Sequence, residues 1–156
     1  MIYFSVFIGV VIVDQLTKSW LSSFLRLYEV KEIIPGFFNL VHVTNSGAAF
    51  SMFANINSPW RHYFFLVMGG VAVAGLTFAC WRMRKKHWLY CFALGLIGGG
   101  AVGNLIDRVR FGSVIDFLDF FVGRYHWPSF NIADSAICIG AGLFLIISIT
   151  DAPGAE

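Results

Sequence analysis

Residues 130–149 read FNIADSAICIGAGLFLIISI, a run of 20 residues whose only charged side chain is Asp134. An α-helix rises about 1.5 Å per residue, so about 20 apolar residues are needed to cross the roughly 30 Å hydrocarbon core of a bilayer. Two further runs carry no charge, and a run at the start of the chain qualifies with two charges inside it. The sequence therefore predicts four transmembrane helices, at residues 2–21, 63–81, 88–106 and 130–149.

The amino-acid composition also indicates an integral membrane protein. Charged residues make up only 13% of the chain, against about 25% in a typical soluble domain. Four spans and their loops use all 156 residues, so we expect a single domain over residues 1–156. Residues 2–13 are apolar like the middle of a signal peptide, but no basic segment precedes them and no A-x-A-like site follows, so we expect an uncleaved first helix. The dispersed basic residues give no indication of a nucleic-acid partner.

The loop at residues 82–87 sets the predicted orientation of the chain. Its sequence, RMRKKH, contains four basic residues and no acidic one. Short loops rich in Lys and Arg remain on the cytoplasmic side of the membrane. We therefore expect both termini in the cytoplasm and the two long loops, at about residues 22–62 and 107–129, on the outer side.

Each outer loop contains an apolar segment that is too short to cross the membrane. Residues 37–44, FFNLVHVT, are β-prone and are followed by a turn signal at residues 45–47, which predicts a small extracytoplasmic β element. Residues 114–122 surround Asp116 and Asp119 with apolar side chains, and we expect them to form an interfacial helical segment in which Asp119 is solvated. The predicted fold class is an all-α membrane protein with these two additions.

Four aspartates lie in or beside the predicted spans, where a carboxylate is costly and usually functional. Asp14 falls about 18 Å along a helix that starts at the cytoplasmic face, and hence in the outer half of the bilayer. Asp107 follows the third span at its outer end, Asp134 lies in the first turns of the fourth, and Asp116 lies on the outer connection between them. All four carboxylates are expected at the level of the outer leaflet.

Amide side chains accompany two of these acids. Asn104 precedes Asp107 by three residues, and Asn131 precedes Asp134 by the same spacing. Residues three apart share a helix face, so each amide is able to orient its carboxylate. For Asn45, in the first outer loop, two interpretations stay open: it forms the turn, or it binds substrate.

Basic neighbours distinguish the four acids from one another. Lys18 follows Asp14 by four residues and Arg108 adjoins Asp107, so these two acids are expected to be ion-paired. The acids without an obvious basic neighbour are Asp116 and Asp134. Two such carboxylates in a site of low dielectric constant share one proton, so that one can activate water while the other protonates or hydrogen-bonds a carbonyl oxygen. This is the chemistry of aspartic peptidases.

Other chemistries have less support in the sequence. The three cysteines, Cys80, Cys91 and Cys138, and the four histidines are dispersed, so neither a metal site nor a cofactor is expected. The alternative function is that of a small proton- or ion-translocating membrane protein using buried carboxylates. Such a relay needs polar groups through the full depth of the membrane, whereas the predicted inner half contains no acid.

Five short motifs, in this order, resemble those of the bacterial lipoprotein signal peptidases, also called signal peptidase II. They are D-Q-x-T-K at residues 14–18, N-x-G-A-A-F-S at 45–51, G-N-x-x-D-R at 103–108, V-x-D-F at 114–117 and F-N-x-A-D at 130–134. The resemblance implies an aspartic endopeptidase of the bacterial inner membrane that cleaves prolipoproteins before a diacylglyceryl-modified cysteine. It also implies contact with membrane lipid and inhibition by the cyclic peptide globomycin.

The resemblance assigns roles to individual positions of this chain. The catalytic pair of the family matches Asp116 and Asp134. Positions that bind substrate or support the site match Asp14, Lys18, Asn45, Asn104, Asp107, Arg108 and Asn131.

Overall fold

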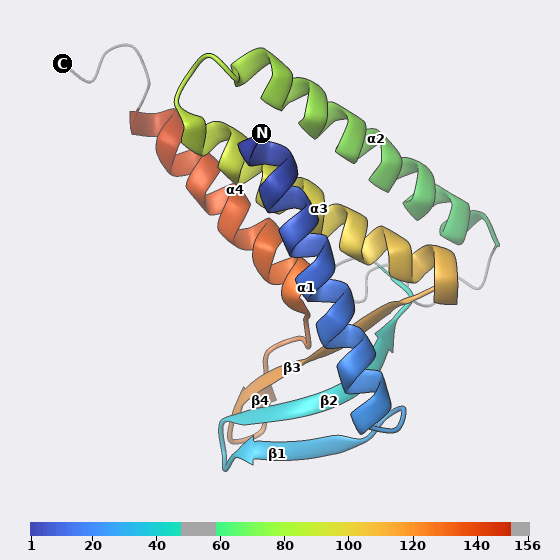
Figure 1. Cartoon of the computed structure of the whole chain (residues 1–156). Coiled ribbons are helices and arrows are strands. Elements are labelled where there is room, and N and C mark those ends of the chain that lie inside the picture. The colour runs from blue at the N-terminus through green and yellow to red at the C-terminus, as the bar shows by residue number, and fades with distance from the viewer. Residues whose placement is uncertain (48–58, 151–156) are drawn as a thin grey trace.

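The computed structural model describes residues 1–47 and 59–150. Its four long helices are α1 (Ile2–Phe24), α2 (Pro59–Met83), α3 (Trp88–Phe111) and α4 (Ile132–Thr150). Each contains an apolar stretch long enough to cross a membrane, which confirms the four predicted helices. The helices form a bundle with a small sheet at one end, and the α2–α3 connection lies at the other (Figure 1).

Helix α3 lies at the centre of the bundle and packs against the other three helices. Close packing is possible because α3 presents glycines where its neighbours approach. A side chain at Gly99 would place its Cβ 2.7 Å from the backbone oxygen of Phe7 on α1, and one at Gly100 would collide with the backbone oxygen of Ala133 on α4. Small residues that let helix backbones approach are typical of packing in membranes, where hydrophobicity gives no preference for protein over lipid.

The Gly99→Ala variant is expected to destabilise the bundle by about 1–3 kcal/mol, because a backbone atom of α1 has to move to admit the new methyl group. Gly9→Ala is the matched control on α1, since a Cβ there has no other atom within 4 Å. Thermal unfolding in detergent should show a lower midpoint for Gly99→Ala than for Gly9→Ala. Equal midpoints would contradict close contact between α1 and α3 at Gly99.

The sheet contains β1 (Val30–Ile34), β2 (Phe38–Asn45), β3 (Val114–Val122) and β4 (Tyr125–His126), antiparallel and in that order. Strand β2 confirms the predicted β element. The predicted helical segment at residues 114–122 is wrong, because these residues form β3. Their β-branched and aromatic side chains favour a strand, and β2 supplies the backbone hydrogen bonds that a helix would otherwise make internally.

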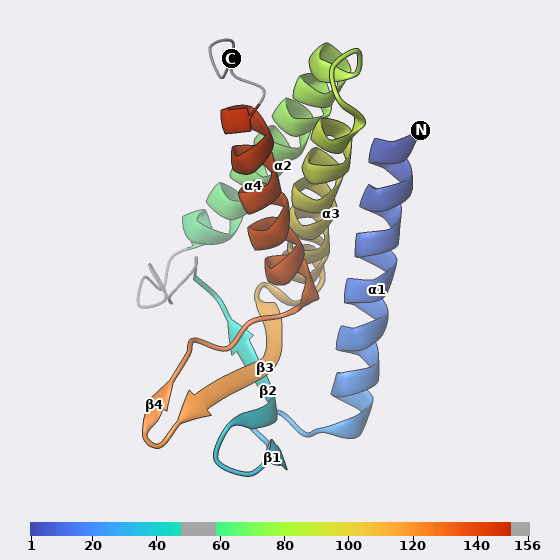
Figure 2. The same ribbon diagram turned by 90° about the vertical axis from the view of Figure 1, so that its left-hand side faces the viewer.

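An apolar cluster joins the sheet to the bundle. Leu21 and Leu25, at the end of α1, pack against Ile115 and Phe117 of β3. This contact fixes the first half of β3 close to the helix ends, while the rest of the strand extends away from them (Figure 2). Strand β3 is thereby held where Asp116, one of its two aspartates, lies near the start of α4.

Candidate active site

The start of α4 brings the first candidate carboxylate into place. Asn131 caps the helix: its Oδ1 accepts a hydrogen bond from the backbone N–H of Asp134 at 3.0 Å, and the Asp134 Oδ2 accepts one from the backbone N–H of Asn131 at 3.2 Å. This reciprocal arrangement is a capping box, which satisfies two otherwise unpaired donors of the first turn. The sequence spacing suggested that both residues lie on one face of the helix. Asn131 instead orients Asp134 from the capping position that precedes the helix.

Two asparagines link the carboxylates of Asp116 and Asp134. Asn131 is fully buried, and its Nδ2 donates to the Asp116 Oδ1 at 2.8 Å and to the Asn104 Oδ1 at 3.2 Å. Asn104, on α3, donates from its Nδ2 to the Asp134 Oδ1 at 2.8 Å. The structure thus brings residues of α3, β3 and α4 into one continuous hydrogen-bonded group.

Lys18 of α1 lies behind this group and is 2% exposed. Its Nζ is 2.9 Å from the Asp14 Oδ2 and 2.8 Å from the Asp107 Oδ2, and it donates to the Asn104 Oδ1 at 3.0 Å. The predicted Asp14–Lys18 pair is confirmed. The predicted pairing of Asp107 with Arg108 is wrong: adjacent helix residues do not face each other, and Lys18 takes that place from another helix.

The position of Lys18 determines which way the Asn104 amide points. An ammonium group only donates hydrogen bonds, so the amide oxygen of Asn104 faces Lys18. The Nδ2 of Asn104 then points to Asp134 and donates to it. Lys18 therefore acts on Asp134 through Asn104 without touching that carboxylate.

The two candidate carboxylates differ in exposure. Asp134 is partly buried, whereas Asp116 is 4% exposed. Burial, and after it the negative charge of Asp134, raises the pKa of Asp116 to about 7, although hydrogen bonds from Asn131 and Asn45 act in the opposite direction. A carboxyl with this pKa retains its proton at mildly acidic pH, while a carboxylate nearby is able to carry the charge.

Arg108 and Asn45 complete the side of the site nearest to α2 and β2. The Arg108 guanidinium donates to the backbone oxygens of Gly47 at 3.1 Å and Asn104 at 3.4 Å, and it lies 5.0 Å from the ring centroid of Phe65. The Asn45 Oδ1 accepts the backbone N–H of Gly47 at 3.0 Å, which confirms its predicted turn-forming role. The same side chain lies near Asp116 and acts to lower the pKa of that carboxyl group. The rest of its motif, residues 48–51, lies outside the described residues.

Gln15 is a site residue that the sequence reasoning missed. Its Nε2 donates to the Asp107 Oδ1 at 2.9 Å, and to the Asp14 Oδ2 and the Gly103 backbone oxygen at 3.2 Å each. Asp14 in turn accepts the backbone N–H of Ala133 at 3.0 Å, so it holds the first turn of α4. The sequence feature that could have identified Gln15 as a site residue is its position beside Asp14 in a helix that is otherwise largely apolar.

Asp119 was expected to be solvated, and this prediction is wrong. It is 6% exposed, accepts a hydrogen bond from the Asn39 Nδ2 at 2.8 Å, and lies 2.9 Å from the His126 Nδ1. Asn39 lies opposite Asp119 in the β2–β3 register, and His126 lies on β4. Neighbouring strands therefore supply the polar partners that permit burial of this carboxylate.

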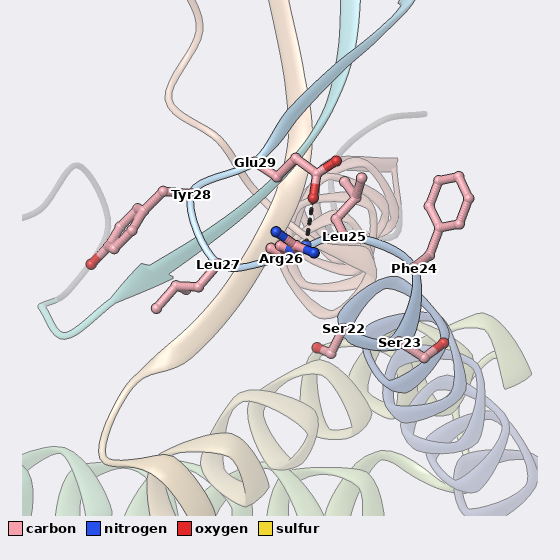
Figure 3. Close-up of a pocket in the computed structure, with 8 residues that line it drawn as sticks. All are labelled: Ser22, Ser23, Phe24, Leu25, Arg26, Leu27, Tyr28 and Glu29. Carbon is pink, nitrogen blue, oxygen red and sulfur yellow. Dashed lines mark hydrogen bonds between the residues drawn. The ribbon is translucent and has the colours of Figure 1, made fainter.

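Two further features bear on where a ligand or metal would bind. A depression of about 750 Å³ lies where α1 leads into β1, but eight consecutive residues, 22–29, line it, and it contains none of the candidate site residues (Figure 3). Among the lining residues, the backbone N–H of Arg26 donates a hydrogen bond to the Glu29 Oε2 at 2.8 Å (Figure 3). Within residues 1–47 and 59–150, no three His, Cys, Asp or Glu side chains gather as metal ligands.

The fold and the site define a helical membrane protein with paired carboxylates at one end of its bundle. A family model described as signal peptidase (SPase) II matches residues 6–150. The lipoprotein signal peptidase of Syntrophotalea carbinolica is 49% identical over 142 residues, covering 91% of this chain and 87% of the relative. That of Janthinobacterium sp. (strain Marseille) is 51% identical over 138 residues, covering 86% and 80% respectively.

The chain is also similar in fold to solved structures. One, described as a bacterial membrane enzyme structure obtained by the in meso method, superposes with a TM-score of 0.82 at 32% identity. The superposition covers 99% of this chain and 91% of the solved one. The chain belongs to the signal peptidase II family.

Proposed function

We propose that this protein is an aspartic endopeptidase that removes the signal peptide from prolipoproteins, and that Asp116 and Asp134 are its catalytic pair. Family membership supports the peptidase activity and does not favour ion translocation. The observation that carries the assignment is the Asn131 side chain, which donates to Asp116 and caps the helix turn that holds Asp134. Asp14 and Asp107 are also bridged by an amide, that of Gln15, but these two carboxylates both form ion pairs with Lys18.

The proposed mechanism uses the difference between the two carboxyl groups. Asp134, in its charged form, removes a proton from a water molecule that attacks the scissile carbonyl carbon. Asp116, in its protonated form, donates to the carbonyl oxygen as charge develops there. Collapse of the tetrahedral intermediate returns the proton of its hydroxyl to Asp116, while Asp134 passes the proton taken from water to the leaving amine. Both groups then regain their starting states.

The cleavage rate should fall as the pH rises through about 7. In this mechanism Asp116 must be protonated, and its raised pKa of about 7 means that the proton is present below that pH and lost above it. The measurement is kcat/KM against pH with a prolipoprotein substrate, in which the alkaline limb reports a group of the free enzyme. Asp119→Asn is the control and should retain the wild-type profile. An activity that keeps rising from pH 6 to pH 9 would exclude Asp116 as the acid.

We place the site at the outer leaflet of the bacterial inner membrane, with both termini in the cytoplasm. Two features of the protein and one general rule support this placement. The helices are those of a multi-pass membrane protein, the basic connection between α2 and α3 lies at the end of the bundle opposite the sheet (Figure 1), and Lys- and Arg-rich short loops stay in the cytoplasm. The scissile bond of a substrate whose signal helix lies in the bilayer would then meet the carboxylates where that helix emerges.

The diacylglyceryl group is proposed as part of what the enzyme recognises, with its acyl chains remaining in membrane lipid. Each methylene contributes about 0.8 kcal/mol to lipid partitioning, so an unmodified prolipoprotein should be a much poorer substrate. Initial rates with matched substrates, with and without the diacylglyceryl group, test this expectation in detergent–lipid micelles. Equal rates at equal concentrations would contradict lipid-dependent capture. Globomycin is proposed to inhibit by occupying the same site, so its inhibition should weaken as the lipid-modified substrate is increased.

A further inference from the structure

Two of the three cysteines meet at the end of the bundle far from the carboxylates. Cys80 lies near the end of α2, and Cys91 lies in the first turn of α3. Their Sγ atoms are 2.6 Å apart, and the Cys91 Sγ is 3.7 Å from the backbone oxygen of Cys80. A disulfide bond joins sulfur atoms at about 2.05 Å, so only a small movement separates this contact from a covalent bond.

A small molecule has access to this pair. Both cysteines line a cavity of about 490 Å³ between the start of α1, the end of α2 and the start of α3. The lining is mainly apolar but includes Arg84. The nucleophile in thiol–disulfide exchange is the thiolate form of a cysteine.

We propose that Cys80 and Cys91 form a redox-active pair, which a low-molecular-weight disulfide converts into an intramolecular disulfide between α2 and α3. One cysteine thiolate attacks the small disulfide, forming a mixed disulfide and releasing one small thiol. The second thiolate then attacks the protein sulfur of the mixed disulfide and releases the other small thiol. The two cysteines are oxidised, the small disulfide is reduced to two thiols, and the two cysteine protons leave on those thiols.

The bond would link α2 covalently to its main packing partner, α3. Helix α2 packs chiefly on α3, and near its other end Phe65 lies against the Arg108 guanidinium beside the candidate site. A covalent link at residues 80 and 91 therefore fastens one end of α2, while the contact with Arg108 holds the other. Because the link closes a short loop, it should form within a single chain and not between copies.

The test uses the purified full-length protein in detergent, incubated with oxidised glutathione, alkylated and digested without reduction. Mass spectrometry is expected to find the peptides of Cys80 and Cys91 joined, with two hydrogen atoms fewer than their sum, and separable by a reductant. The Cys80→Ser and Cys91→Ser variants should each lose this product. Cys138→Ser, which alters the exposed cysteine on α4, should retain it.

The chain denatured in detergent is the control for the oxidant. If glutathione oxidises cysteines in the denatured chain but leaves Cys80 and Cys91 both alkylatable in the folded protein, the proposal is overturned. A mixed disulfide that persists at one of them, or a link from either to Cys138, overturns it as well. Because the two serine variants change different helices, a folding failure in one leaves the other to decide.

Discussion

Replacing Asp116 by Asn is expected to lower the rate of prolipoprotein cleavage by about 10²- to 10⁴-fold, the usual contribution of a positioned acid or base. The Asp134→Asn variant should lose a similar factor, because two groups that share one proton act as a unit. An amide keeps the shape of the carboxyl group but does not exchange the proton. Initial rates with a lipid-modified substrate, beside thermal unfolding of each variant, measure the effect.

The two variants should differ in stability. Asp116 accepts the Asn131 amide on one oxygen, and the amide oxygen of an Asn can still do so. Asp134 accepts hydrogen bonds on both oxygens, from Asn104 and from the backbone of Asn131. An Asn at position 134 has only one acceptor oxygen. The Asp134→Asn protein should therefore be less stable than the Asp116→Asn protein by about 0.5–1.5 kcal/mol in its free energy of unfolding.

Asp119→Asn is the matched control for both variants, since Asp119 is a buried aspartate on the same strand as Asp116. Its partners are Asn39 and His126 and not the residues of the candidate site. It should keep most of the activity. A folded Asp116→Asn or Asp134→Asn protein with a rate like that of Asp119→Asn would remove that aspartate from the catalytic pair.

The largest loss of stability is expected for Lys18→Met. Methionine has a similar volume but no charge, so Asp14 and Asp107 would be left buried without their cation. Removing one partner of a buried ion pair typically costs about 3–5 kcal/mol. The yield of folded protein and its midpoint of thermal unfolding should both fall, and activity should fall with them because Asn104 is no longer held toward Asp134.

Lys31→Met provides the control for Lys18→Met, because Lys31 is exposed on β1 and lies 4.3 Å from the ring centroid of Phe24. Its effect on the unfolding midpoint should be small, as is usual for surface charges. A Lys18→Met protein with the stability and activity of Lys31→Met would show that the lysine does not organise the site. Recovery of stability when Asp107→Asn is added would support the ion-pair account.

The helices of this protein were predictable from sequence because few backbone structures are stable within lipid. Backbone groups within lipid must be hydrogen-bonded internally, so a long apolar run such as residues 130–149 forms a helix. The polar residues that meet in the site were also visible, since Asp14, Asn104, Asp107 and Asn131 interrupt runs that are otherwise apolar. Local spacing sufficed for the Asp14–Lys18 pair, which lies within one helix.

The contacts between elements were not predictable in this way. Strand β3 forms because β2 pairs with it, and nothing in residues 114–122 identifies that partner. Lys18 reaches Asp107 from another helix, whereas sequence spacing pointed to the adjacent Arg108. Burial of Asp119 likewise depends on Asn39 of β2. In each case the deciding neighbour lies far away in the chain.

If Asp116 and Asp134 are the catalytic pair, this chain cleaves a prolipoprotein at one defined bond and needs both carboxyl groups to do so. The most direct measurement is the intact mass of both products after the purified protein acts on a diacylglyceryl-modified prolipoprotein in detergent. We expect a free signal peptide and a lipoprotein that begins at the lipid-modified cysteine, with both products forming about 10²-fold or more slowly from the Asp116→Asn protein. Cleavage at another bond, or the same two products from folded Asp116→Asn at the wild-type rate, would contradict this assignment.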